Sequence, residues 1–220
     1  ELEKLGHYFD RIRGGGNRLL RLLNDLLNLS KLESGKMEFL MQQGNLVDII
    51  KRATEEVETL ITDRELTVVI EATDLNTITY FDKEKILQVL INLLSNAIKF
   101  TPIGKQITIF FDPHISAQPN VQHAETDLLT VVVDDQGLGI PQEEETTIFD
   151  KFIQSSKTNT GAGGTGLGLS IVKEIINAHN GYIAATGNPD GGARFRFSLP
   201  IITHLDEEIK AEQVPEVDFF

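Results

Sequence analysis

The sequence predicts an α+β protein, a two-layer α/β sandwich in which a mixed, largely antiparallel sheet carries helices on one face, preceded by a long helix. Leucines with helical spacing fill the first part of the chain, up to residue 33. Two strongly apolar segments, 106–112 and 128–134, are typical of strands, and residues 182–199 indicate a hairpin. Hydrophobic residues make up 40% of the 220 residues, enough for a core within one or two domains.

A single helix is predicted over residues 5–33, because its leucines form a broad apolar stripe. Ile12, Leu19 and Leu26 lie seven residues apart in the sequence. A stripe this wide favours burial against more than one partner helix, as in a four-helix bundle. A helix packed on one ordinary core stays an alternative.

Glycines interrupt and end this first helix. The three consecutive glycines at 14–16 each cost about 1 kcal/mol relative to Ala inside a helix, so we expect a weak point or a close helix approach there. Gly35, within Ser34-Gly35-Lys36, is a typical C-terminal stop signal. Residues 1–36 are therefore predicted to form the first unit of the chain.

A second unit is predicted over residues 37–201. Asn45 is suited to cap a helix that ends near Asp63, and residues 66–72 are β-branched and predict a strand. Asp82 is a good N-cap for the next helix, which Thr101-Pro102 ends. The predicted buried face of that helix consists of Ile86, Leu87, Leu90, Ile91, Leu94 and Ile98.

Strands and one more helix complete the second unit. The predicted elements are strands 106–112 and 128–134, a polar surface loop at 113–127, an amphipathic helix at 170–180 ended by Gly181, and a hairpin of strands 182–186 and 193–199 joined by the turn 188–192. Residues 202–220 are acidic and lack periodicity, which predicts a tail or linker.

The composition excludes several classes of function. A formal net charge of −13 argues against a general nucleic-acid binder and against contact with an anionic membrane surface. The chain has no Cys, hence no disulfide framework and no thiolate site, which fits a cytoplasmic location. No apolar run reaches the roughly 18 residues of a membrane span, although a longer parent chain could carry a membrane anchor.

The helix that begins after Asp82 carries polar side chains on one face. Asn92 and Asn96 are four residues apart, so both amides lie on the same side, and Lys99 is three residues further on. Amide oxygens are suitable ligands for Mg²⁺, and the ammonium group of Lys99 can meet a phosphate. A polar face that simply meets water is the alternative.

A second motif, Asp135-Gln136-Gly137-Leu138-Gly139, follows the apolar strand 128–134. A carboxylate at a strand end can accept a hydrogen bond from an exocyclic amine such as that of adenine. The two glycines let the backbone approach a base closely. Strand alternation directs the neighbouring Asp134 to the opposite side. A solvated turn is the alternative.

Two phenylalanines, Phe149 and Phe152, precede a small, polar segment, 154–163, that is suited to a mobile lid. Core packing of the two rings is compatible with this reading. Lys157 is the only cation of the segment, and we expect it to contact a phosphate.

The segment Gly164-Thr165-Gly166-Leu167-Gly168-Leu169 opens directly into the helix 170–180. Backbone N–H groups at a helix N-terminus form an anion site, and glycines allow phosphates close approach. The spacing is neither that of a Walker loop nor that of a Rossmann fingerprint. Gly191-Gly192 is a weaker glycine motif, for which a simple hairpin turn is at least as good an explanation.

In this order, the four motifs resemble the catalytic ATP-binding domain of two-component sensor histidine kinases, within the superfamily of gyrase, heat-shock chaperone, histidine kinase and MutL ATPases. The resemblance covers residues 5–201. It implies ATP and Mg²⁺ as cofactors, with Asn96 as the metal ligand, Lys99 on a phosphate and Asp135 on adenine. Asn92, Asn96 and Lys99 are the implied catalytic residues. The implied ATP-binding residues are Asn92, Asn96, Lys99, Phe100, Asp135, Gly137, Gly139, Ile140, Phe149, Phe152, Lys157, Gly164, Thr165, Gly166, Leu167, Gly168 and Leu169.

The resemblance also implies partners: a second copy of the chain through the dimerisation bundle of residues 1–36, and a response-regulator receiver domain. The family's H box, a His followed by an acidic residue and Arg-x-Pro, does not occur in the sequence. His7 is followed by Tyr8-Phe9-Asp10, and we expect surface or packing roles for it and for His114, His123, His179 and His204. The chain is therefore expected to be a fragment that begins after the acceptor helix, or a protein that lost it.

Two other functions stay open. Hydrolytic ATPases of the same superfamily carry a Glu that activates water where this chain has Asn92, and a transducer domain follows their ATP site. A nucleotide-binding signalling module without catalysis would keep the binding residues alone. Replacing Asn96 or Asp135 tests the site that all three functions share.

Overall fold

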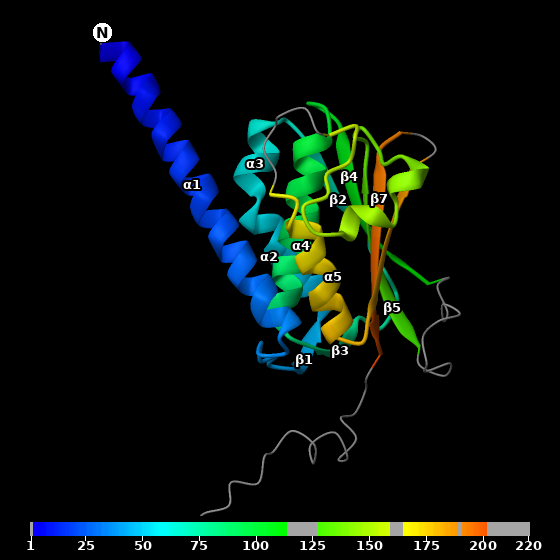
Figure 1. Cartoon of the computed structure of the whole chain (residues 1–220). Coiled ribbons are helices and arrows are strands. Elements are labelled where there is room, and N and C mark those ends of the chain that lie inside the picture. The colour runs from blue at the N-terminus through cyan, green and yellow to red at the C-terminus, as the bar shows by residue number, and fades with distance from the viewer. Residues whose placement is uncertain (1, 114–126, 159–164, 189–190, 202–220) are drawn as a thin grey trace, which may run out of the picture.

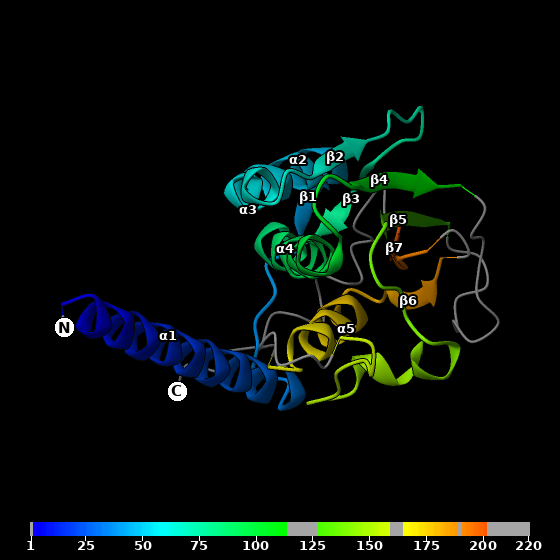
Figure 2. The same cartoon turned by 90° about the horizontal axis from the view of Figure 1, so that it is seen from above.

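The computed structural model describes residues 2–113, 127–158, 165–188 and 191–201, and its centre is a five-stranded sheet with helices on one face (Figures 1 and 2). The strands follow the order β2-β4-β5-β7-β6. They are β2 (Thr67–Ile70), β4 (Gln106–Asp112), β5 (Leu128–Asp135), β6 (Tyr182–Gly187) and β7 (Ala193–Pro200). β2 pairs parallel with β4, and the other pairings are antiparallel. The predicted mixed, largely antiparallel sheet is confirmed.

Five α-helices surround one side of this sheet within the described residues. They are α1 (Leu2–Glu33), α2 (Leu46–Glu56), α3 (Glu58–Asp63), α4 (Lys83–Phe100) and α5 (Gly168–Ala178). Two short 3₁₀ turns, η1 (Gln142–Glu144) and η2 (Thr147–Phe149), lie between β5 and α5. In both views α1 contacts the rest of the molecule near α5 with its C-terminal part, while its N-terminal part projects away (Figures 1 and 2).

The core lies between the sheet and helices α4 and α5. Burial alternates along β4, where Ile107 and Ile109 are completely buried and face the helices. The predicted apolar face of α4 is confirmed, with only Ile91 partly exposed. Asp82 caps α4 as predicted: its carboxylate accepts hydrogen bonds from the backbone N–H groups of Glu84 at 3.1 Å and Lys85 at 3.0 Å.

The prediction of a single helix from Asn45 to Asp63 is wrong, because the structure has two helices there: α2 ends before Val57 and α3 starts after it. Val57 has φ −105° and ψ 9°, which is not helical, and its β-branched side chain is buried in the core. The free energy gained by burying this side chain exceeds the free energy lost by interrupting the helix at this residue. The N-cap at Asn45 is confirmed, since its side chain accepts the N–H of Val47 at 2.9 Å.

A two-stranded antiparallel sheet of β1 (Gln42–Asn45) and β3 (Ile78–Phe81) was not predicted. The sequence of β1, Gln-Gln-Gly-Asn, has no apolar alternation, so its strand structure comes from its partner. Gly44 lies against Phe81: a Cβ atom at Gly44 would lie 2.8 Å from Cζ of the Phe81 ring. The pairing therefore depends on a contact between residues almost forty positions apart, which local patterning does not show.

Helix α1 is continuous through its glycine run, and within the described residues no atom outside the helix lies within 4 Å of a Cβ built at Gly14, Gly15 or Gly16. No other element of the described chain comes close to α1 there, and a close approach by a helix of a second copy stays a prediction. The predicted stop is confirmed: Gly35 has φ +63°, its N–H donates to the Leu32 carbonyl, and the N–H of Lys36 donates to the Lys31 carbonyl. Most of the predicted loop 113–127 and the whole predicted tail 202–220 lie outside the described residues.

Only the C-terminal part of α1 is packed on the rest of the chain. Leu29 is buried, and Leu22 and Leu32 are partly buried against the core. The other large apolar side chains of the stripe are exposed, namely Tyr8, Phe9, Ile12, Leu19, Leu20, Leu23, Leu26 and Leu27. In the part of the chain that the structure describes, no helix is both long and apolar enough to cross a membrane.

Candidate functional site

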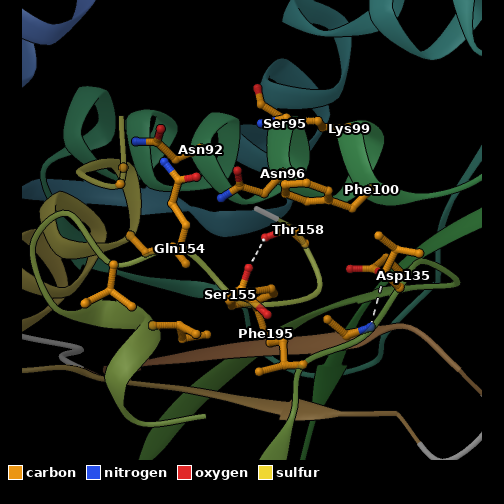
Figure 3. Close-up of a pocket in the computed structure, with 18 of the residues that line it drawn as sticks. Asn92, Ser95, Asn96, Lys99, Phe100, Asp135, Gln154, Ser155, Thr158 and Phe195 are labelled. Carbon is orange, nitrogen blue, oxygen red and sulfur yellow. Dashed lines mark hydrogen bonds between the residues drawn. The ribbon is translucent and has the colours of Figure 1, made fainter. Parts of the chain in front are cut away.

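A pocket of about 430 Å³ opens between α4, the N-terminus of α5 and the ends of β5 and β7 (Figure 3). Its lining combines several apolar side chains with side chains that carry amide, hydroxyl or carboxylate groups. The lining residues are Asp25, Asn92, Ser95, Asn96, Lys99, Phe100, Asp135, Leu138, Gly139, Ile140, Ile148, Ile153, Gln154, Ser155, Thr158, Thr165, Gly166, Gly168, Leu169, Ala193 and Phe195.

One wall of the pocket is the polar face of α4. Asn92, Asn96 and Phe100 follow one another along the helix at intervals of four residues, with Asp135 beyond Phe100 (Figure 3). At a rise of about 1.5 Å per residue, this row spans roughly 12 Å. Lys99 also lines the pocket, and its ammonium nitrogen lies 4.8 Å from the centre of the Phe100 ring. The amides and the cation that the sequence grouped on one helix face thus line one cavity.

The N-terminus of α5 closes the Asn92 end of this row. A Cβ atom at Gly168, the first residue of α5, would lie 3.3 Å from Oδ1 of Asn92. The free N–H groups of this helix turn and the amides of α4 therefore share one end of the pocket. Oriented N–H donors at a helix N-terminus attract anions, so this end is suited to phosphate groups.

Asp135 marks the opposite end. Its side chain is nearly buried, and Oδ1 accepts hydrogen bonds from the backbone N–H groups of Gly137 at 2.8 Å and Ala193 at 3.0 Å. Neither of these bonds uses Oδ2. Burial raises the pKa of Asp135 to about 6, the two hydrogen bonds from Ala193 and Gly137 oppose this rise, and the neighbouring charge of Asp134 adds to it.

Two glycines bring the ends of β5 and β7 together around Asp135. Gly192 has φ +104°, and a Cβ atom there would lie 1.8 Å from the carbonyl oxygen of Asp135. Gly139 has φ +72°, and its Cβ would lie 2.7 Å from the carbonyl oxygen of Gly192. No other residue fits either position without a backbone shift. Gly192 therefore shapes the pocket, a role that the sequence left open beside that of a simple turn.

Asp134 points to the other face of the sheet, as strand alternation predicts. Its carboxylate binds Arg194 at 2.5 Å and accepts a hydrogen bond from Nδ2 of Asn188 at 2.9 Å. It contributes to the pocket only through its charge, next to Asp135.

The two phenylalanines ahead of the lid segment have different environments. Phe149 is buried and packs edge-on against Phe195, with ring centres 6.4 Å apart. Phe152 is exposed, has φ +63°, and donates its N–H to the Gly166 carbonyl at 2.9 Å. Among the described residues, neither ring belongs to the pocket lining. Phe149 supports the wall behind Phe195, whereas Phe152 joins the lid segment to the turn before α5.

The described part of the lid segment lies over the pocket. Gln154, Ser155 and Thr158 belong to the lining, and Thr158 donates a hydrogen bond to the Ser155 carbonyl (Figure 3). Lys157 donates to the Leu138 carbonyl at 3.3 Å and is not among the lining residues, so in this conformation it points to the rim. Gly164 lies outside the described residues.

The carboxylate of Glu144 holds the start of this segment. Both of its oxygens accept the N–H of Ser156 at 3.1 Å. Hydrogen bonds from Ser155 and Ser156 lower the pKa of Glu144. The segment 154–158 is thus tied to η1, ahead of the two phenylalanines.

The remaining predicted residues either line the pocket or support it. Gly139, Ile140, Thr165, Gly166, Gly168 and Leu169 line the pocket. Leu167 is completely buried beneath the turn, and Gly137 packs on Phe100, whose carbonyl oxygen would lie 2.8 Å from a Cβ there.

Sequence reasoning did not name several lining residues. Ser95 could have been found, because it lies on the same α4 face as Asn92 and Asn96. Asp25 could not, because it comes from α1, almost seventy residues before the first motif. Its Oδ2 atom accepts a hydrogen bond from Oγ1 of Thr165 at 3.2 Å.

His179 is the one histidine whose side chain the structure describes, and it is buried as a packing residue. Its Nδ1 atom lies 2.7 Å from the Ile175 carbonyl, and Nε2 accepts the N–H of Asp82 at 3.0 Å. His7 lies in α1, and His114, His123 and His204 lie outside the described residues. Over the described ranges, no group of three His, Cys, Asp or Glu side chains is placed to hold a metal ion.

Residues 81–203, more than half of the chain, match the family described as histidine kinase-, DNA gyrase B- and HSP90-like ATPases. The sensor histidine kinase WalK of Bacillus subtilis (strain 168) is 34% identical over 184 residues, which cover 83% of this chain and 28% of WalK. The chain thus spans about a quarter of the length of this relative.

Three solved structures are similar in fold. The catalytic domain of histidine kinase ThkA, in a nucleotide-free form, is 32% identical with a TM-score of 0.59, covering 74% of this chain and 96% of that domain. ThkA in complex with the response regulator protein TrrA has 25% identity and a TM-score of 0.67, covering 89% of this chain and 51% of ThkA. Full-length ShkA in complex with AMPPNP has 24% identity and a TM-score of 0.71, covering 90% of this chain and 39% of ShkA, and this likeness concerns the fold.

Proposed function

Because this chain belongs to the family of histidine kinase-, DNA gyrase B- and HSP90-like ATPases and carries the ATP-binding catalytic domain of sensor histidine kinases, we propose that it binds Mg-ATP and donates the γ-phosphoryl group to a His on a bundle helix. The phosphoryl group would then pass to an Asp of a response regulator. The observation that carries the proposal is one pocket with two chemically different ends, a buried carboxylate at one and amides beside a helix N-terminus at the other.

The Asp135 end fits the base of the nucleotide. Gly137 and Ala193 fix the carboxylate through Oδ1, which leaves Oδ2 for the exocyclic amine of adenine. Phe100, Ile140 and Phe195 supply apolar surface for the ring. The glycines at 139 and 192 let the ends of β5 and β7 approach each other closely, which keeps Ala193 within hydrogen-bond distance of the Asp135 carboxylate. Selection of adenine would depend on the ionised form of Asp135.

The Asn92 end fits the phosphates. The turn 165–168 presents backbone N–H groups at this end. Lys99 lies beside Phe100, seven residues further along α4, and would reach from there toward the phosphates nearer the base, in a chain whose formal net charge is −13. Lys157 lies at the rim on the Leu138 carbonyl and would reach a phosphate only if that hydrogen bond opened. The lid segment would then close over the triphosphate and limit the access of water.

The donors at this end also fit Mg²⁺. Asn92 and Asn96 offer amide oxygens, and Ser95 offers a hydroxyl oxygen. All three are hard, neutral oxygen ligands. A Mg²⁺ ion prefers such oxygens together with phosphate and water, and we assign Asn96 as its protein ligand. When bound, the ion would neutralise charge on the phosphates.

The proposed chemistry is transfer of a phosphoryl group from an oxygen of ATP to a nitrogen of the acceptor His. An imidazole nitrogen of the acceptor His forms a bond to the γ-phosphorus, the bond from that phosphorus to the bridging oxygen breaks, and ADP leaves. The protein positions the triphosphate and stabilises its charge, so no basic side chain is required in the pocket. Delivery would follow movement of the pocket toward the bundle helix.

Two partners follow from this proposal. A second copy of the chain would cover the exposed apolar stripe of α1, forming the dimerisation bundle. A receiver domain of a response regulator would take the phosphoryl group, as supported by ThkA having been crystallised with the response regulator TrrA. A cytoplasmic location is part of the same proposal.

Hydrolysis of ATP is a weaker alternative for this pocket. A hydrolytic site needs a base that accepts a proton from water. The polar side chains of α4 that line the pocket, Asn92, Ser95, Asn96 and Lys99, include no carboxylate, and the carboxylate that α1 adds to the lining, Asp25, already accepts the hydroxyl hydrogen of Thr165. Glutamate at position 92 would supply such a base, and Asn92 does not. A nucleotide-binding module without catalysis would differ from the proposed kinase only in that it does not transfer the phosphoryl group.

The experiment is a phosphotransfer assay in a polypeptide that carries an H-box helix ahead of residue 1. With γ-labelled Mg-ATP we expect acid-labile phosphohistidine that a receiver domain removes. Asn96→Ala should lower the rate at least about a hundredfold, as expected for the loss of a positioned transition-state contact. Nucleotide binding without phosphohistidine would contradict the transfer and leave the two alternatives, which release of labelled phosphate from ATP distinguishes.

A further inference from the structure

Helix α1 contributes a carboxylate to the nucleotide pocket. Asp25 belongs to the lining, and its Oδ2 atom accepts the hydroxyl hydrogen of Thr165 at 3.2 Å. The same Thr165 oxygen accepts the N–H of Leu167 at 3.2 Å. Thr165 therefore connects α1 with the turn that begins α5. Thr165 belongs to the last of the four motifs, whereas Asp25 lies in α1, outside all of them.

The carboxylate of Asp25 lies at the phosphate end of the pocket. Thr165 precedes Gly168 by three residues, and Gly168 lies against Asn92. Asn92 is roughly 12 Å along α4 from Phe100, which lies near Asp135. With adenine at Asp135, the terminal phosphate of a triphosphate would reach the Asn92 end, whereas a diphosphate would stop short of it. The distance along α4 thus distinguishes the two nucleotides.

Apolar packing holds α1 in this position together with the hydrogen bond between Asp25 and Thr165. Leu29 is buried, and Leu22 and Leu32 pack against the core on either side of Asp25 in the helix. Asp25 is itself half-buried, so its charge is only partly screened by water. A negative charge of this kind disfavours a second negative charge placed beside it.

We propose that Asp25 opposes the binding of ATP while α1 is docked on α5, and that it opposes the binding of ADP much less. Because coupling between two binding events is reciprocal, ATP in turn weakens the docking of α1. The bundle helix would thereby be released in the triphosphate state and held in the diphosphate state. This inference rests on the proposed function, since it takes the pocket to bind adenine nucleotides.

The opposite effect would arise if Asp25 bound the metal ion of Mg-ATP. A metal-binding carboxylate would strengthen the binding of Mg-ATP, and its loss would weaken that binding. The hydrogen bond from Thr165 already uses Oδ2 of Asp25, and the amides of Asn92 and Asn96 on α4 supply neutral oxygens to the same pocket as metal donors. We therefore favour repulsion, and the sign of the mutational effect decides between the two roles.

The test compares Asp25→Asn with the unmodified chain by calorimetry, using ATP and ADP with Mg²⁺. Asparagine keeps an oxygen for Thr165 but removes the charge, so the Kd for ATP should fall about fivefold and that for ADP less than about twofold. Glu55→Gln is the matched control, because it removes one negative charge from the exposed surface of α2. It should change neither Kd. Weaker binding of Mg-ATP by Asp25→Asn would overturn the proposal, and so would equal changes for both nucleotides.

Amide hydrogen exchange provides a readout that does not depend on nucleotide affinity. Asp25→Ala removes the acceptor of Thr165 and should increase exchange in residues 19–33 of the nucleotide-free chain, whereas Asp25→Asn should not. In the unmodified chain, saturating ATP should increase exchange there more than saturating ADP. If neither nucleotide binds, the proposed function fails, and the nucleotide-free comparison still tests the contact between Asp25 and Thr165. Equal protection of α1 with ATP and with ADP would contradict the proposal.

Discussion

The carboxyl group of Asp135 titrates close to neutral pH because it is nearly buried, with a pKa of about 6. The proposed contact to adenine requires its ionised form. Adenosine binding should therefore weaken as the pH falls from 7.5 to 5, by about tenfold at one unit below that pKa. Adenosine is the suitable ligand because phosphate groups titrate in the same range, with a second pKa of about 6.

The control for this measurement is Asp135→Asn, which cannot ionise. It should bind adenosine weakly and with no dependence on pH over the same range. A pH profile that is the same in the variant and the unmodified chain would show that another group titrates. The measurement is calorimetry or equilibrium dialysis at constant ionic strength.

The paired glycines 191 and 192 allow a test of how the pocket is built. Both have positive φ, but an added Cβ at Gly191 meets no atom of the described residues within 4 Å, whereas one at Gly192 would lie 1.8 Å from the Asp135 carbonyl oxygen. Gly191→Ala should cost about 1–2 kcal/mol of backbone strain. Gly192→Ala should cost more, about 3 kcal/mol or above, and should abolish adenosine binding. Urea unfolding measures the stabilities, and equal losses in both variants would contradict this view of the pocket.

Some residues of the site could be predicted from local sequence patterns, and others could not. The grouping of Asn92, Asn96 and Lys99 follows from helical spacing, and the opposite directions of Asp134 and Asp135 follow from strand alternation. Asp25 reaches the pocket only because α1 packs on α5, so no local sequence pattern predicts that it belongs to the site. Gly192 looks like an ordinary turn glycine until β5 and β7 are brought together.

At the scale of whole elements, Asp82 and His179 join three segments of the fold. The Asp82 carboxylate caps α4 and also accepts the N–H of Leu40, in the connection that follows α1, at 2.9 Å. Its own N–H donates to Nε2 of His179 near the end of α5, and the edge of the Phe39 ring packs on that imidazole. The start of α4, the end of α5 and the chain from α1 thus meet at one point.

His179 should make the stability of this junction depend on pH. Burial lowers the pKa of His179 below the usual 6.5, the Ile175 carbonyl and the charge of Asp82 oppose this shift, and a proton on Nε2 would face the N–H of Asp82. The unfolded chain therefore binds the proton first, so this contribution is full above about pH 6.5 and is lost as the pH falls below it. His179→Gln should destabilise the fold by about 1–3 kcal/mol at pH 7.5 and by less at pH 5.5.

The measurement is the free energy of unfolding in urea between pH 5 and 8, taken as the difference between variant and unmodified chain. The difference is needed because Asp135 contributes the opposite slope: its raised pKa means that stability falls as the pH rises from about 4 to about 6. A difference that does not vary with pH would show that His179 acts only through packing.

Elements were predictable where one segment carries its own pattern. Strand β4 and helix α4 combine apolar periodicity with a clear start, and both agree with prediction almost residue by residue. Strand β1 and the break at Val57 were missed because each depends on a distant partner, Phe81 for the strand and the core for the valine. Contacts between remote segments decided these elements.

For the whole molecule, the main feature to explain is the exposed apolar stripe of α1, whose leucines between residues 19 and 27 are largely left uncovered by the described chain. Leu19, Leu20 and Leu27 are each 59% exposed. Apolar side chains concentrated in this way mark an interaction surface. The chain should therefore associate with itself as its concentration rises, and Leu20→Lys combined with Leu27→Lys should weaken association at least about tenfold.

Sedimentation equilibrium of the unmodified chain and the double variant measures this association. Asn24→Lys combined with Ser30→Lys adds the same two charges at exposed polar positions of α1 and should leave association unchanged. A monomer at every concentration, with α1 helical, would contradict the bundle role of this helix.

The assignment of the nucleotide pocket is tested first by the binding of ATP, measured by calorimetry with and without Mg²⁺ on the unmodified chain, Asn96→Ala and Asp135→Asn. The unmodified chain should bind ATP with a micromolar Kd, and the binding should become tighter when Mg²⁺ is added. Asn96→Ala should lose the effect of Mg²⁺, and Asp135→Asn should bind at least about tenfold more weakly with Mg²⁺ present. Absence of binding at millimolar ATP, or binding that neither substitution changes, would contradict the assignment of this pocket as the nucleotide site.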